Sequence, residues 1–148
     1  MEVKIIYNQR NGLTYLKQIV KTGYLAELSG LHQDILSKVS NGRDVNLHPF
    51  QYSDKSVKKI NEAIRKLTDI ISLVIFTEDT ALDQMLELSK ILKTKRIFTK
   101  DAITDGRYRV CFVDKKSRYY GKPRPHEVLK MNEVMCKIVS ELQRIEIK

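Results

Sequence analysis

The chain has 148 residues, enough for one compact core or two small ones, and its charged fraction of 30% is ordinary for a globular protein. Its formal net charge of +9 favours a polyanionic partner, with nucleic acid before an anionic membrane surface. Neither a signal peptide nor a run of ~20 apolar residues is present, so we expect a cytoplasmic, intracellular protein with no membrane partner.

The first residues allow two interpretations. Val3, Ile5 and Tyr7 alternate as a short strand would, yet the segment could equally extend the helix that follows. Asn11-Gly12 interrupts this segment. Apolar residues at helical spacing then predict a first helix over residues 13–21.

Two short helices meeting at a glycine are predicted next, in the sequence TGYLAELSGLHQDILSKVSNGR from Thr22 to Arg43. Thr22 is a candidate N-cap, and Gly30 suits a sharp turn at positive φ. The apolar face of the second helix is formed by Leu31, Ile35, Leu36 and Val39. A small residue, a glycine turn and a following apolar stripe together form a helix-turn-helix pattern.

This segment resembles the helix-turn-helix of Cro and lambda-repressor-like DNA-binding domains, which are common in phage and mobile-element regulators. The resemblance covers the N-terminal half of the chain only. It implies that the second helix enters the major groove of double-stranded DNA. The residues that it implies as base contacts are Gln33, Asp34, Ser37 and Lys38. Those that it implies as phosphate contacts are Thr22, His32, Asn41 and Arg43.

A long helix is predicted after the polar loop of residues 44–52, with Ser53 as its N-cap. Its apolar seam consists of Val57, Ile60, Ile64, Leu67, Ile71 and Val74. A shorter helix is predicted over residues 82–93, and a last helix over residues 126–146. The apolar seam of the last helix consists of Val128, Met131, Met135, Ile138, Leu142 and Ile145. Either seam could be core or a contact with a second copy of the chain.

Between these helices, two strands are predicted over Arg96–Thr99 and Arg107–Asp114, because Tyr108, Val110 and Phe112 alternate with polar residues. A basic loop, residues 115–125, follows and ends in prolines. Residues 93–124 carry eleven Lys and Arg against three acids, a surplus of eight. The hairpin could therefore be a second nucleic-acid contact or a solvated basic surface. Its candidate contacts are Arg107, Arg109, Lys115, Lys116, Arg118, Lys122 and Arg124.

Aromatic residues are interleaved with these cations, and Tyr108, Phe112, Tyr119 and Tyr120 could either stack on bases or brace the hairpin. His126-Glu127 is better explained by capping of the last helix than by acid–base chemistry.

Signals for catalysis are weak. The run Asp114-Lys115-Lys116 after an apolar strand resembles the D-x-K element of metal-dependent nucleases, and Asp101 or Asp105 would have to supply the second carboxylate. Cys111 and Cys136 have no metal-ligand spacing and are expected to be buried thiols in a reducing compartment. We expect no cofactor, no resident metal and no enzyme activity, and no internal repeat is apparent.

The sequence thus predicts a mostly α protein with two parts. Residues 1–76 form a helix-turn-helix bundle, and residues 77–148 form a small α+β module of helix, two-stranded hairpin and helix. The predicted function is sequence-specific binding of double-stranded DNA, as a homodimeric transcriptional regulator. One alternative is an interaction module that binds a protein or RNA through the basic hairpin. A metal-dependent nuclease is the third.

Overall fold

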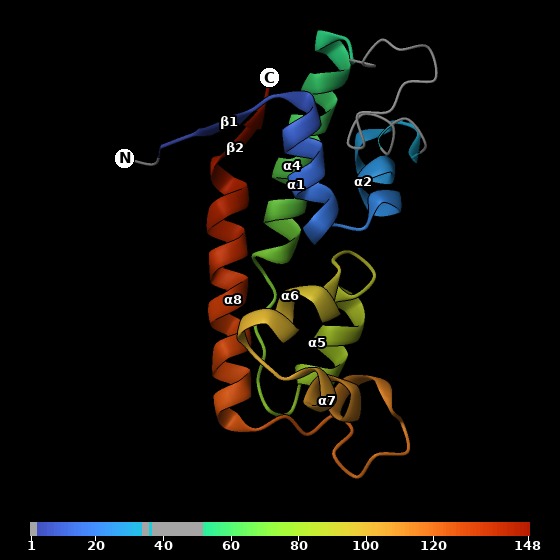
Figure 1. Cartoon of the computed structure of the whole chain (residues 1–148), viewed down its shortest axis with the longest axis vertical. Helices are drawn as coiled ribbons and strands as arrows, with labels where there is room; N and C mark the ends of the chain where they lie inside the picture. Colours follow the sequence, from blue (N-terminus) through green and yellow to red (C-terminus); the bar gives the residue numbers. More distant parts are fainter. Residues whose placement is uncertain (1–2, 34–35, 37–51) are drawn as a thin grey trace. The chain divides into compact units, whose positions relative to one another are not determined.

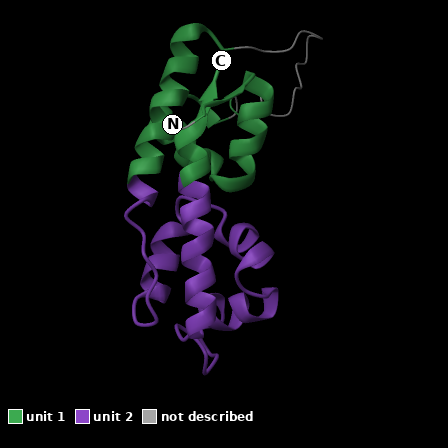
Figure 2. Ribbon diagram, turned by 90° about the vertical axis from the view of Figure 1, so that its left-hand side faces the viewer, with its two compact units in different colours: residues 1–69, 140–148 green, residues 70–139 purple. Residues whose placement is uncertain are grey.

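The computed structural model describes residues 3–33, 36 and 52–148, and these residues are mostly helical (Figure 1). The chain forms two compact units, coloured separately in Figure 2. Unit 1 consists of residues 1–69 and 140–148, and unit 2 consists of residues 70–139. The predicted α-dominant fold class is confirmed. The sequence analysis divides the chain after residue 76, and the two compact units divide it after residues 69 and 139.

Unit 1 contains the described helices α1 (Gln9–Ile19), α2 (Thr22–Ser29) and α4 (Asp54–Ile71). It also contains a two-stranded parallel sheet in which β1 (Ile5–Tyr7) pairs with β2 (Ile145–Ile147), side by side in Figure 1. The strand interpretation of the first residues is therefore correct. The described core of this unit includes Leu13, Leu16, Val20, Leu25, Leu36, Val57, Ile60, Ile64, Leu67, Leu142 and Ile147.

Helix α1 begins earlier than predicted because Asn8 caps it. The Asn8 side chain accepts a hydrogen bond from the backbone N–H of Asn11, at 2.8 Å. Gly12, predicted to interrupt the chain, lies inside the helix. A Cβ at Gly12 would come within 2.7 Å of Ile147 Cγ1, so a glycine there lets β2 approach the helix closely.

Helix α2 ends at the predicted glycine, but its cap differs from the prediction. The N-cap is Lys21, and no side chain makes a capping hydrogen bond there, so the prediction of Thr22 as N-cap is wrong. Gly30 ends the helix at φ 72°, the left-handed conformation that was predicted. Gln33 and Leu36 are helical, and the Leu36 N–H bonds the His32 carbonyl at 3.1 Å.

Unit 2 is helical in every region where the sequence predicted strands. Its helices are α5 (Ala81–Leu88), α6 (Thr94–Asp101), α7 (Asp105–Tyr108) and the π-helical segment η1 (Arg109–Val113), followed by α8 (Pro125–Arg144). Residues of α8 up to Val139 belong to unit 2, and the remainder belongs to unit 1.

The predicted two-stranded hairpin is wrong, and the reason lies in local hydrogen bonding. The Thr104 side chain accepts from the Arg107 N–H at 3.2 Å and thereby starts α7. The buried residues that follow are Tyr108, Cys111 and Phe112, which have helical spacing, whereas the predicted alternation required Val110 to be inside. Cys111 is buried as expected, but Cys136 is exposed.

Capping at both long helices agrees with the prediction. The Ser53 hydroxyl accepts from the Ser56 N–H, and the Glu127 carboxylate accepts from the Arg124 N–H at 2.7 Å, with Pro125 in the first helical position. Helix α4 ends at Ile71, and the predicted seam residue Val74 lies in the non-helical segment that follows. The other residues of both seams are buried within the chain. They are therefore core, and they are not free to form a contact between two copies.

An internal repeat is present, although none was recognised in the sequence. Helices α2 and α6 have equal length and begin at Thr22 and Thr94, 72 positions apart. Helices α4 and α8 begin at Asp54 and Pro125, 71 positions apart. Among the described residues, α1, α2 and α4 of unit 1 follow one another in the same order as α5, α6 and α8 of unit 2, and the helical residues Gln33 and Leu36 stand where unit 2 has α7. Several buried positions correspond in pairs: Leu16 and Leu88, Val20 and Leu92, Leu36 and Tyr108, Val57 and Val128, Ile60 and Met131, Ile64 and Met135. The buried positions of α2 and α6 do not correspond, because Leu25 and Ser29 match Ile97 and Asp101, which are not buried.

The same hydrogen-bonded clamp occurs once in each unit. In unit 1 the Asn61 side chain donates to the Ile147 carbonyl and accepts from the Ile147 N–H, both at 2.8 Å. In unit 2 the Asn132 side chain makes the same two bonds to Phe76, at 2.9 and 2.8 Å. The two asparagines lie 71 positions apart along the chain, and so do Phe76 and Ile147. The two units therefore share a clamp that uses the same side chain and the same backbone groups at corresponding positions.

Candidate nucleic-acid interface

The predicted base-reading helix of unit 1 is described only at its start. His32 and Gln33 are exposed, and Thr22 is half-buried at the beginning of α2. A Cβ at Gly23 would lie 3.5 Å from Gln33 Oε1, so the Gln33 amide lies near the first turn of α2. The other predicted contacts, Asp34, Ser37, Lys38, Asn41 and Arg43, lie outside the described residues.

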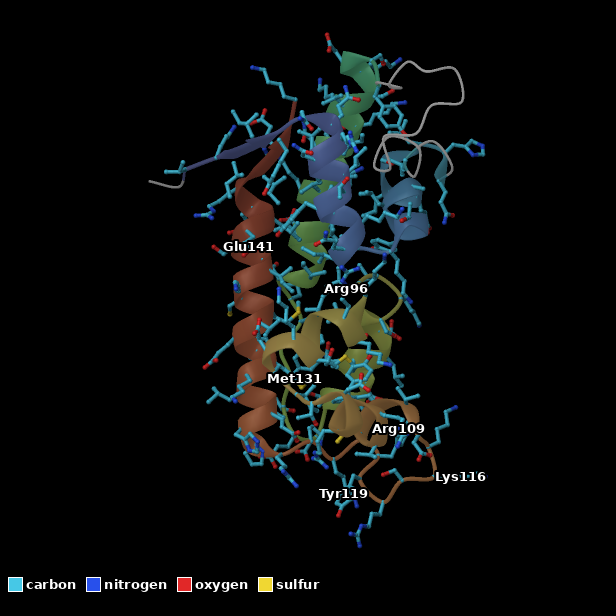
Figure 3. The ribbon with its side chains drawn as sticks, viewed as in Figure 1. Arg96, Arg109, Lys116, Tyr119, Met131 and Glu141 are labelled. Atoms are coloured by element: carbon cyan, nitrogen blue, oxygen red, sulfur yellow. The ribbon has the colours of Figure 1, made fainter. Side chains whose placement is uncertain are left out.

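The cations predicted as a second contact lie on a helical segment of unit 2 and on the loop after it, and not on a hairpin. Arg109 lies on η1, and the loop after η1 carries four further exposed cations, Lys115, Lys116, Arg118 and Lys122. Figure 3 labels Arg109, Lys116 and Tyr119 in this part of unit 2. We call these five cations and the exposed Arg124 the basic surface.

Arg107 serves a different purpose, because it is bound to a buried carboxylate. Its Nε and Nη2 donate to the two oxygens of Glu127 at 3.1 and 2.8 Å, a bidentate pair. The two side chains are 17% and 5% exposed. Burial alone would oppose ionisation of Glu127, but hydrogen bonds from Arg107 and the Arg124 N–H hold the pKa of Glu127 below its usual value. Arg107 therefore connects α7 to the start of α8 and is not a free phosphate ligand.

The aromatic residues of this region have different surroundings. Tyr108 and Phe112 are buried and pack on one another, with ring centroids 5.5 Å apart, and the Tyr108 hydroxyl lies 2.7 Å from Thr94 Oγ1. These two rings brace the unit and cannot stack on bases. Tyr119 is 40% exposed, and the guanidinium carbons of Arg107 and Arg118 lie 5.3 and 4.8 Å from its ring centre. Cation–π contacts thus position Arg118 at the edge of the basic surface.

A polar hollow of about 450 Å³ lies between the end of α6 and the start of α8. Basic groups from three elements line it: Lys100, Arg107, Arg124, His126 and Lys130. Asp101 and Glu127 are the acidic groups in its lining, and Glu127 is already paired with Arg107. Basic side chains therefore outnumber acidic ones in the lining of the hollow.

The nuclease-like triplet forms a local turn. Asp114 is exposed, and its side chain accepts from the Lys116 backbone N–H at 3.0 Å. Across the described ranges, no three His, Cys, Asp or Glu side chains come together as a metal site would require. Nor does any helix in those ranges have the length and apolar character needed to cross a membrane.

Comparisons of the chain with protein-family models, curated proteins and solved structures give no match.

Sequence reasoning missed the buried Arg107–Glu127 pair and the helical form of α7 and η1. One signal for the helix was present, since Thr104 followed by Asp105 is a typical helix start. The pairing of Arg107 with Glu127 spans 20 positions, and nothing in the local sequence indicates it.

Proposed function

We propose that the chain binds double-stranded DNA sequence-specifically and acts as a transcriptional regulator. The observation that carries the proposal is the junction after α2. Gly30 turns the chain at φ 72°, and a new helical segment then begins with Gln33 exposed and Leu36 buried. This combination of turn, exposed polar residue and apolar anchor is what a helix-turn-helix requires.

Charge supports the same conclusion. The formal net charge of +9 attracts a polyanion at long range, and the basic surface offers cations that are exposed on one unit. Phosphate contacts of this kind supply affinity without sequence choice, whereas an amide such as that of Gln33 can bond adenine bidentately. The two kinds of residue together fit a protein that reads duplex DNA.

The test begins with selection of a preferred site from a random-sequence duplex pool. Gln33→Ala is expected to weaken binding to the selected site by about 1–3 kcal/mol and to leave binding to random duplex nearly unchanged. Fluorescence anisotropy on both duplexes, at fixed salt concentration, measures this difference.

Gln143→Ala is the matched control, since Gln143 is an exposed amide of the same unit on α8. It should bind both duplexes as the unchanged protein does. Equal losses on selected and random duplex for Gln33→Ala would mean that Gln33 contacts only phosphates. No enrichment of any sequence during selection would contradict the proposed function itself.

A further inference from the structure

The repeat makes α7 and η1 of unit 2 the counterpart of the helical segment that begins at Gln33 in unit 1. Each segment follows an eight-residue helix, and the first helical residues, Gln33 and Asp105, are 72 positions apart. Each is anchored by a buried side chain at the corresponding position, Leu36 in one unit and Tyr108 in the other. The described residues of the first segment, Gln33 and Leu36, therefore correspond in sequence position and burial to Asp105 and Tyr108.

The two long helices also have identical residues at corresponding positions. Between residues 57–67 and 128–138, five of eleven positions are identical. The identical pairs are Val57 and Val128, Lys59 and Lys130, Asn61 and Asn132, Glu62 and Glu133, and Lys66 and Lys137. Only the valines among them are buried core residues, so packing alone does not account for the match.

We propose that α7 and η1 form a second reading helix, so that one chain recognises two different half-sites in duplex DNA. This inference rests on the proposed function and extends it from one reading element to two. A reading helix requires exposed residues that can face DNA, and the described structure of unit 2 provides them. Asp105, Gly106 and Arg109 are exposed, at the positions that correspond to Gln33, Asp34 and Ser37.

Arg109 is the strongest candidate for a base contact. It is exposed on the first position of η1, and an arginine can bond the two major-groove acceptors of guanine bidentately. Gly106 lies nearly one turn earlier, and a Cβ built there would meet nothing within 4 Å, so a DNA backbone or base edge could approach this turn closely. The wider turn of η1 begins at Arg109, so positions beyond it are not assigned by analogy.

Charge distinguishes the two reading segments. Residues 94–115 carry six basic and three acidic side chains, whereas the corresponding residues 22–43 carry two of each. The excess lies in α6, which carries Lys95, Arg96 and Lys100, so that helix would contribute to phosphate attraction. The different outward residues of the second segment would read different bases. The site should contain two unlike halves, and a palindrome is not expected.

The experiment selects a site from a random duplex pool with the full chain, and then measures each half separately. We expect two unlike conserved blocks bound by one chain, with a bound mass corresponding to 17.3 kDa of protein per site by light scattering. Arg109→Ala should relax base preference in one block only and weaken binding to the full site roughly ten- to hundredfold. Gln33→Ala should relax the other block.

Lys137→Ala is the charge-matched control, because Lys137 is an exposed cation of the same unit on α8. It should leave base preference in both blocks unchanged, and thermal melting should confirm that all variants fold. A palindromic site bound by two chains, with preference unaffected by Arg109→Ala, would overturn this inference and leave the proposed function standing. A chain that enriches no sequence would overturn both.

Discussion

Replacing Glu127 with alanine is expected to lower the free energy of unfolding by about 3–5 kcal/mol. The substitution leaves the Arg107 guanidinium, only 17% exposed, without its bidentate partner. It also removes the acceptor for the Arg124 N–H at the start of α8. Urea unfolding followed by circular dichroism measures the change.

Two further variants make this result interpretable. Glu133→Ala removes an exposed carboxylate from the same helix and should change stability by no more than about 0.5 kcal/mol. The double variant Arg107→Met, Glu127→Leu removes both charges together and should recover much of the loss. If Glu127→Ala unfolds at the same urea concentration as Glu133→Ala, the buried pair contributes nothing to stability.

The same pair predicts how stability depends on pH. In the folded protein the pKa of Glu127 is below its usual value of 4.5, while in the unfolded chain it returns to that value. The stabilisation is therefore complete above about pH 5 and is lost as the pH falls through the lowered folded pKa. The variant Glu127→Gln has no such group, so its stability should fall less on acidification. Parallel slopes for the two proteins between about pH 5 and pH 3 would contradict the assignment.

Replacing Lys115, Lys116, Arg118 and Lys122 with serine is expected to weaken DNA binding on every sequence alike. Each phosphate contact adds about 0.9 to the slope of affinity against salt on a logarithmic scale, so four lost contacts flatten it by roughly three to four units. Base preference at a selected site should not change, because these side chains are not expected at base edges. Binding measured by anisotropy over a salt series gives both quantities.

A charge-matched variant on α4 controls for the loss of net charge. Lys58, Lys59, Arg65 and Lys66 are exposed there, and their replacement with glutamine removes the same four charges. This variant should keep most of the original salt slope. If the two variants behave alike, the basic surface makes no specific contact with DNA, and only the total charge of the protein matters.

Helices with a clear apolar period could be predicted from the sequence, and irregular ones could not. The apolar seams of α4 and α8 and the turn at Gly30 follow from local patterns that are visible in the sequence. The segment Arg107–Val113 alternates in polarity like a strand, yet tertiary burial of Tyr108, Cys111 and Phe112 favours a helix. Periodicity alone could not decide between these outcomes, because the segment is short.

The candidate site was predictable in composition and less so in arrangement. The excess of basic residues in 93–124 is visible in the sequence. The sequence does not show that Arg107 is paired with Glu127, 20 positions away, and is therefore not an exposed cation like the others. The repeat escaped detection because its two halves share few identities outside the long helices. Corresponding starts of helices and the paired asparagine clamps make it recognisable in the structure.

The order in which the ribosome makes the chain has an unusual consequence for unit 1. Domains ordinarily fold in sequence as they emerge, beginning with the N-terminal one. Here β1 can pair only after β2 has been synthesised, and Asn61 can form its hydrogen bonds only after Ile147 has been synthesised. Strand β2 and Ile147 belong to the segment Ser140–Lys148. All of unit 2 is synthesised before that segment, so unit 2 can complete its fold first. The N-terminal unit is then closed by residues synthesised long after its own helices, which leaves part of its core open to chaperones during translation.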